Sequence, residues 1–214
     1  VRSRRQRQMC IRDSIYSIVL GLLGFLILYT QTTPLASFIA LLANIFYSFI
    51  YTLILKPRTN QNIVIGGAAG AAPVLIGWAA TGTPLETGSW LLFLLVFLWT
   101  PAHFWALSIE NVDDYKDADF PMLPTQETKK RTSIFIGIYS CATVITSLMI
   151  APILQLGFIY LILSLISGIY LMIKSYRLYS DKIKPISYFV FSNTYLAVVF
   201  LSMIADILFT IRNT

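Results

Sequence analysis

The sequence predicts an all-α polytopic membrane protein, built as a bundle of transmembrane helices. Three observations support this fold class. Only 12% of the 214 residues are charged and 57% are hydrophobic, whereas soluble globular domains carry about 25% charged residues. The mean hydropathy is +0.71. The apolar residues also gather into seven long runs, so most of the surface is suited to lipid rather than water.

Each run approaches the length of about 20 residues that a helix needs to cross the hydrocarbon core. We predict helices, because lipid cannot satisfy exposed backbone groups and no run alternates as a barrel strand does. The seven runs are residues 15–30, 34–55, 63–80, 89–109, 133–151, 156–173 and 188–211. Polar segments separate most of them, and residues 110–132 form the longest.

The distribution of basic residues predicts an orientation. With seven spans, fifteen of the sixteen Lys and Arg residues fall on the same side as the N-terminus, and only Arg212 falls on the other. Lys and Arg accumulate in cytoplasmic loops, so this side is predicted to be cytoplasmic.

Residues 1–14 are dense in Arg and do not resemble a signal peptide. We predict a non-native or disordered basic tail here, followed by one transmembrane domain over residues 15–214. A polybasic arm held by anionic lipid and an Arg-rich transit peptide are the alternatives.

Six of the ten acidic residues lie between Glu110 and Glu127. Asp113 and Asp117 are four residues apart and share a face if the preceding helix continues. Such a helix would align His103, Glu110, Asp114 and Asp117 in one stripe. The cluster predicts a divalent cation site, for which Mg²⁺ is the natural occupant, while a solvated loop is the alternative.

Two further segments carry candidate chemistry. Lys56 and Arg58 could hold a diphosphate through charge-assisted hydrogen bonds, or they could be ordinary positive anchors. His103, the only histidine, lies among aromatic residues and could ligate a metal or haem iron or transfer a proton. A histidine hydrogen-bonded within the bundle is the alternative. The small-residue stretch 63–73 predicts close helix packing, which would also leave room for a bulky substrate.

These segments resemble the haem O synthases, a group within the UbiA-type intramembrane prenyltransferases. Three blocks carry the resemblance: KPRTNQNIVIGGAAGA at residues 56–71, WTPAHFWAL at 99–107 and DDYKDADFPMLP at 113–124. The resemblance implies a ring of nine transmembrane helices, of which this chain would hold the third to the ninth. The chain is therefore expected to be an N-terminally truncated fragment.

The resemblance also implies roles for individual residues. Asp113, Asp114 and Asp117 are expected to bind Mg²⁺ and to act with His103 in catalysis. The expected diphosphate ligands are Lys56, Arg58, Asn62 and Lys116. The expected lining of the haem or prenyl cavity is Trp99, His103, Phe104, Trp105 and Tyr115.

The implied reaction transfers a farnesyl group from farnesyl diphosphate to a vinyl group of haem b, giving haem O for terminal oxidases. The implied partners are haem b, farnesyl diphosphate, membrane lipid, and haem A synthase or the oxidase assembly machinery, with no nucleic acid. The implied location is a bacterial inner membrane, with the mitochondrial inner membrane as the alternative.

One departure from the family pattern bears on activity. The family's first Asp-rich motif should precede the third helix, but only Asp13 stands there. We therefore expect this chain alone to be inactive.

Two other functions remain open. A UbiA-type enzyme acting on an aromatic quinone precursor should lack the block at 99–107. A cation-linked transporter often shows internal repeats and broken midplane helices, whereas this sequence shows no convincing repeat and its charges lie at the mouth rather than the midplane.

Overall fold

The computed structural model describes residues 4–213, with side chains from Ile11 to Arg212, and this part of the chain is helical without strands. The helices are α1 (Arg4–Gln31), α2 (Pro34–Ile45), η1 (Phe46–Leu55), α3 (Asn62–Ala80), α4 (Thr87–Glu110), α5 (Val112–Asp117), α6 (Leu123–Gln126), α7 (Lys129–Ile153), α8 (Phe158–Tyr179) and α9 (Pro185–Asn213). The π-helix η1 continues α2. Seven helical segments are long and apolar enough to cross a membrane, so the predicted fold class and the predicted spans are confirmed.

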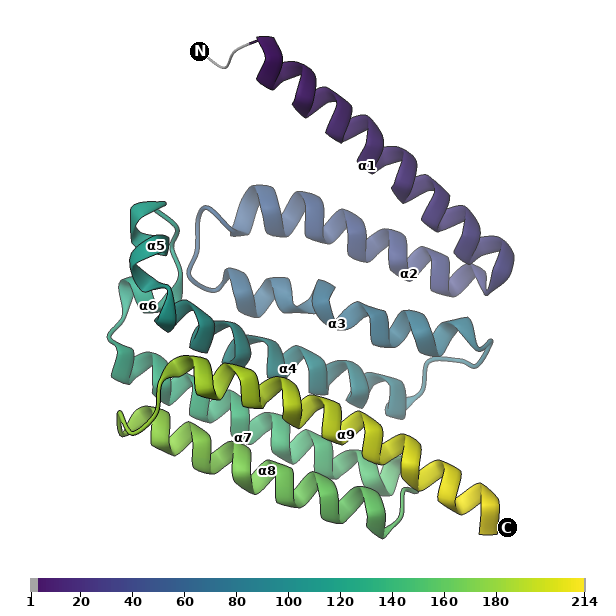
Figure 1. The fold of residues 1–214 in the computed structure, drawn as a ribbon. Helices are drawn as coiled ribbons and strands as arrows, with labels where there is room; N and C mark the ends of the chain where they lie inside the picture. Colours follow the sequence, from purple (N-terminus) through teal and green to yellow (C-terminus); the bar gives the residue numbers. More distant parts are fainter. Residues whose placement is uncertain (1–3, 214) are drawn as a thin grey trace.

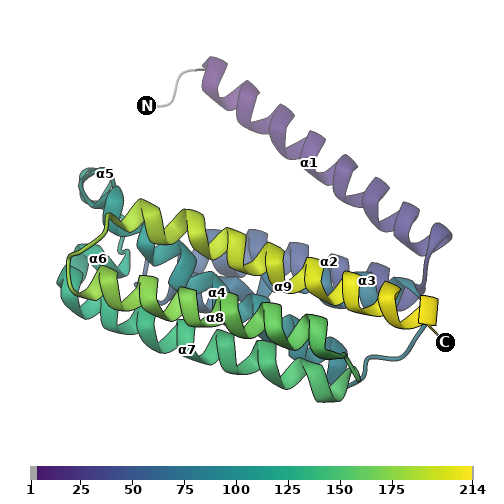
Figure 2. The same cartoon turned by 60° about the horizontal axis from the view of Figure 1, so that its bottom comes forward.

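Helix α4 lies at the centre of the bundle. It packs against α3 on one side and against α7 and α9 on the other, while α8 closes the group against α7 and α9. Helix α2 packs against α3, and α1 packs mainly against α2. Figures 1 and 2 show α1 diverging from the other helices toward its N-terminal end.

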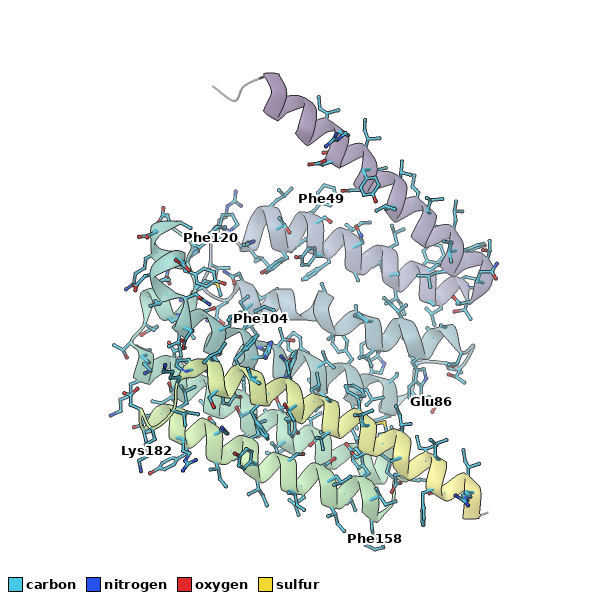
Figure 3. All side chains as sticks on the ribbon, in the orientation of Figure 1. Phe49, Glu86, Phe104, Phe120, Phe158 and Lys182 are labelled. Carbon is cyan, nitrogen blue, oxygen red and sulfur yellow. The ribbon has the colours of Figure 1, made fainter. Side chains whose placement is uncertain are left out.

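The seven spans run antiparallel in sequence, so the loops alternate between two ends of the bundle. Helices α5 and α6 and the α8–α9 loop lie at one end, which we call the basic end (Figure 1). In Figure 3, Lys182 marks this end, and Glu86 and Phe158 mark the opposite one. The basic residues that the structure describes from Lys56 to Lys184 belong to helix ends and loops at the basic end, whereas Arg12 lies on the diverging part of α1 and Arg212 belongs to the opposite end.

Side-chain hydrogen bonds fix several helix starts. The Thr33 hydroxyl caps α2 by accepting from the Ala36 amide at 3.2 Å, and it donates to the Ala79 carbonyl of α3 at 2.8 Å. The α8 start is capped from another helix. The Asp206 carboxylate of α9 accepts from the Gly157 amide at 2.6 Å and the Tyr160 amide at 3.3 Å. These bonds satisfy amides that a helix leaves unpaired at its start.

A ladder of buried tyrosines joins α7 to its neighbours. The Tyr188 hydroxyl lies 2.6 Å from the Ser140 hydroxyl, and the Tyr195 hydroxyl donates to Ser147 Oγ at 2.9 Å. Both pairs repeat after seven residues, so they lie on matching faces of α7 and α9. From α8, the Tyr160 hydroxyl donates to the Ser147 carbonyl at 2.6 Å.

Two helices extend beyond the apolar runs from which they were predicted. Helix α8 starts at Phe158 and ends at Tyr179, six residues beyond the predicted end of its apolar run. The extension is possible because Lys174 keeps its ammonium near polar and aromatic partners, donating to Ser187 Oγ at 3.0 Å and lying 5.5 Å from the Tyr170 ring. Helix α1 begins at Arg4 and so includes residues 4–14, while residues 1–3 lie outside the described residues; that residues 1–14 are a non-native or disordered tail stays a prediction.

Candidate functional site

A polar pocket of about 370 Å³ opens at the basic end. Its lining combines both charges with aromatic and hydroxyl side chains. The lining residues are Pro57, Arg58, Tyr115, Lys116, Asp119, Phe120, Pro121, Thr125 and Gln126. They come from the segments before α3 and after α4, and all but Thr125 and Gln126 belong to two of the three blocks singled out in the sequence.

Three contacts hold these two segments together. The Asn60 amide donates to Gln126 Oε1 at 2.8 Å, and the Asn62 amide donates to the Pro121 carbonyl at 3.3 Å. The Lys56 ammonium lies 5.1 Å from the centre of the Phe120 ring. Asn62 is fully buried and braces the pocket wall, and its contact with a diphosphate stays a prediction.

A tight turn after α5 brings Tyr115, Lys116 and Asp119 to the pocket. The Phe120 amide donates to the Tyr115 carbonyl at 2.9 Å, and the Asp119 amide donates to the Lys116 carbonyl at 3.0 Å. Asp119 adopts a φ of 52°, a left-handed conformation that Asp tolerates better than most residues. Sequence reasoning counted Asp119 among the acidic residues but did not place it in the site.

The three predicted metal ligands lie beside the pocket rather than in its lining. Asp113, Asp114 and Asp117 are exposed on α5. Asp113 comes within 4.0 Å of the Lys116 ammonium, and its side chain is 91% exposed. Within residues 4–213, no group of three or more His, Cys, Asp or Glu side chains is close enough to hold a metal ion.

The predicted stripe from His103 to Asp117 does not form. Helix α4 ends at Glu110, and Asn111 leaves the helical conformation with φ −108° and ψ 31°. The Asn111 side chain donates to the Leu107 carbonyl at 3.0 Å, which stabilises the end of α4. The chain then restarts as α5, so His103 and Asp117 do not share one helix face.

A second, aromatic pocket of about 220 Å³ lies between η1, α3 and α4. Its lining residues are Tyr47, Tyr51, Ile63, Gly66, Gly67, Gly70, Thr100 and Phe104. The Tyr51 ring lies directly on Gly66, where a Cβ atom would overlap the ring. Gly66 therefore permits both the close packing and the space that the small-residue stretch predicted.

Of the five residues predicted to line a cavity, Phe104 lines the aromatic pocket and Tyr115 the polar pocket. His103 is only 6% exposed. Its ring stacks between Trp99 and Phe189, each 4.2 Å away between ring centres, and its Nδ1 lies 2.7 Å from Ser192 Oγ. The structure therefore shows the alternative prediction, a histidine hydrogen-bonded within the bundle.

The two tryptophans also pack between helices. Trp99 donates from its indole nitrogen to the Ser192 carbonyl of α9 at 2.9 Å. Trp105 is 1% exposed and meets the rings of Phe135 and Tyr139 of α7 edge-on.

Sequence reasoning missed Tyr47 and Tyr51 in the aromatic pocket. Their four-residue spacing just before Lys56 was the available signal.

The sequence profile of the UbiA prenyltransferase family matches residues 14–204, which include both pockets and the larger part of every membrane-spanning helix. The chain belongs to the UbiA prenyltransferase family. Its place in that family agrees with the resemblance read from the three sequence blocks.

Three relatives of this UbiA family chain share the name protoheme IX farnesyltransferase. A protoheme IX farnesyltransferase of Mycolicibacterium smegmatis is 40% identical over 197 residues, which are 90% of this chain and 63% of that protein. One of Thermus thermophilus is 42% identical over 198 residues, 91% of this chain and 33% of that protein. One of Rhodococcus jostii is 38% identical over 218 residues, 96% of this chain and 72% of that protein.

The UbiA family chain thus spans about 63% of the length of the Mycolicibacterium relative, and less of the Thermus relative. No solved structure matches it.

Proposed function

We propose that this chain carries part of the active site of an enzyme that transfers a farnesyl group from farnesyl diphosphate to a vinyl group of haem b. The observation that carries the proposal is its identity of 40% with a protoheme IX farnesyltransferase across 90% of the chain. The product would be haem O. A bacterial inner membrane is the proposed location, because the relatives compared are bacterial proteins and the chain has seven candidate spans.

The two pockets suit the two parts of such a donor. The polar pocket, with Arg58 and Lys116, suits a diphosphate, and the aromatic pocket, with Tyr51 and Phe104, suits an isoprenoid chain. Arg58 of the polar pocket and Ile63 of the aromatic pocket lie five residues apart, where the chain enters α3. We therefore place the diphosphate at the basic end and the farnesyl chain deeper in the bundle.

The proposed chemistry breaks the bond between farnesyl C1 and the diphosphate oxygen. Arg58 and Lys116, with Lys56 nearby, would stabilise the negative charge on the leaving diphosphate. The faces of Tyr47, Tyr51 and Phe104 would stabilise the allylic cation. The haem vinyl carbon would then bond to farnesyl C1. Water would add to the resulting cation and release a proton.

Asp113, Asp114 and Asp117 are the residues proposed to hold Mg²⁺. Their oxygen donors are exposed next to the polar pocket, and Mg²⁺ needs only one or two protein carboxylates when waters and phosphate oxygens complete its shell. When bound, the ion would neutralise charge on the diphosphate as it leaves. His103 would act indirectly, by fixing α4 against α9, because it is buried and hydrogen-bonded to Ser192.

Haem extraction from cells tests the proposed function. Cells that lack their own haem O synthesis would express a fusion that adds the part of the M. smegmatis protein that this chain does not match. The 214-residue chain would be measured in parallel. Extracted haems would be separated by chromatography and weighed by mass spectrometry. We expect the fusion to yield haem b carrying one added farnesyl group and one water, and the product to disappear in Asp114→Ala.

Unchanged haem b, with the fusion confirmed in the membrane, would contradict the haem assignment. A farnesylated aromatic acid in the same cells would instead support the quinone-precursor alternative.

A further inference from the structure

A third hollow lies outside both pockets, on the outer surface where α7 begins and α8 ends. It has a volume of about 290 Å³ and is lined by Ser133, Ile134, Gly137, Met172, Ser175, Tyr176 and Tyr179. We call it the α7–α8 groove. Both helices are candidate membrane spans, and Figure 1 shows these helix ends beside each other at the basic end.

The lining follows one face of each helix. From Lys130, the α7 residues Ser133, Ile134 and Gly137 follow at three, four and seven positions, and α8 repeats this spacing from Met172 to Tyr179. Such residues share a helix face. Because α7 and α8 run antiparallel, Lys130 and Tyr179 meet at the mouth of the groove, where the ammonium lies 5.3 Å from the ring centre.

Small residues keep the groove open. Gly137 carries no side chain, and a Cβ atom there would lie 3.4 Å from Ser175 Oγ. Ser133 is buried and donates its hydroxyl to the Lys129 carbonyl at 2.9 Å, so it presents little polarity to the groove. The outer walls are apolar and open, with Ile134 47% exposed and Tyr176 64% exposed. The groove is therefore shaped for a hydrocarbon chain.

The three basic residues at the mouth of the groove differ in whether a carboxylate pairs with them. Lys129 is paired with Asp181, and Arg131 lies 3.3 Å from Glu127. Lys130, between them, is exposed and has no carboxylate partner within residues 11–212. An ammonium without a counterion thus stands over an apolar groove at the level where a membrane span meets its headgroup region.

We propose that the α7–α8 groove binds an anionic phospholipid, with one acyl chain lying past Gly137 and the phosphate on the Lys130 ammonium. Basic side chains at the membrane surface attract anionic headgroups, whereas a zwitterionic headgroup offsets its phosphate with its own cation. This site shares no lining residue with either pocket and does not depend on the proposed transferase activity.

Native mass spectrometry of the purified 214-residue chain in detergent measures this binding directly. Phosphatidylglycerol and phosphatidylcholine of identical acyl chains would be titrated in turn, and the occupancy of the first lipid compared. We expect tighter binding of phosphatidylglycerol. Lys130→Gln should weaken it about fivefold, the effect of roughly one basic residue at a membrane surface. Gly137→Leu should weaken both lipids by filling the groove.

Two control variants separate this site from general attraction. Arg177→Gln removes an exposed charge from the last turn of α8 on the face away from the groove, and Gly77→Leu adds the same bulk where a Cβ atom meets nothing within 4 Å. Both should leave the affinity unchanged. Equal binding of the two lipids, or an equal loss in Arg177→Gln and Lys130→Gln, would overturn the proposal. Because Lys130 is exposed, its variant tests the proposal even if Gly137→Leu fails to fold.

Discussion

Arg58 is the residue on which the polar pocket's proposed role depends most. It is exposed at the basic end and lines the pocket with Lys116, so its guanidinium is free to meet a diphosphate. Hydrogen bonds to charged groups contribute about 1.5–3 kcal/mol, so we expect Arg58→Ala to lower kcat/KM for farnesyl diphosphate about ten- to a hundredfold. Initial rates with the membrane-embedded fusion measure this. Arg177→Ala, at the same end but outside the pocket, should retain the wild-type rate; a matching loss there would contradict the assignment.

Asp206 is expected to affect the stability of the bundle rather than its activity. It is 3% exposed within a membrane span and accepts hydrogen bonds from two amides at the start of α8. Asp206→Ala leaves these amides without their acceptor, which costs about 1–3 kcal/mol of unfolding free energy. Thermal unfolding in detergent would show a lower Tm. Glu86→Ala is the matched control, because Glu86 precedes α4 without capping it. Equal Tm values for the two variants would refute the capping role.

Single residues were also where sequence reasoning was weakest. The pattern around His103 allowed either a ligand or a packed histidine, because only the neighbouring α9 residues Phe189 and Ser192 decide between them. These partners lie about 90 positions away in the chain, and no local pattern identifies them. Asn62 was likewise chosen for its chemistry, whereas its burial depends on the distant Pro121 carbonyl.

Among the elements, α7 and α9 are linked by two side-chain hydrogen bonds that reach across the bundle. The Tyr195–Ser147 and Tyr188–Ser140 bonds repeat along both helices. Interhelical hydrogen bonds in membrane proteins contribute about 0.6 kcal/mol on average and up to about 1.7. A double-mutant cycle with Tyr195→Phe and Ser147→Ala should therefore give a coupling free energy in this range, measured by unfolding in micelles. Pairing Ser147→Ala with Tyr16→Phe, an exposed residue of α1, should give none. Independent effects of Tyr195 and Ser147 would contradict the ladder.

Element type was predictable and element ends were not. Apolar length alone identified all seven spans, because crossing a membrane requires it. The break at Asn111 was not foreseen, since it depends on a side chain turning back to the Leu107 carbonyl. The sequence likewise indicated the segments around Arg58 and Tyr115 as separate candidate sites. Only the fold shows that they meet in one pocket.

At the scale of the whole molecule, the separation of charge predicts the orientation. The basic residues from Lys56 to Lys184 gather at one end, which should face the cytoplasm. With Cys10 and Cys141 replaced by Ser, a single cysteine at Glu86 should react with a membrane-impermeant maleimide on intact cells. A single cysteine at Lys182 should react only after the membrane is permeabilised. The reverse labelling pattern would contradict this orientation.

We propose above all that this UbiA family chain uses its two pockets to place farnesyl diphosphate for attack by haem b. The most direct measurement supplies membranes containing the fusion with farnesyl diphosphate, haem b and a competing aromatic acid, and weighs the products. We predict farnesylated haem alone, in an amount that falls with Arg58→Ala. Farnesylated aromatic acid with unmodified haem would contradict the claim.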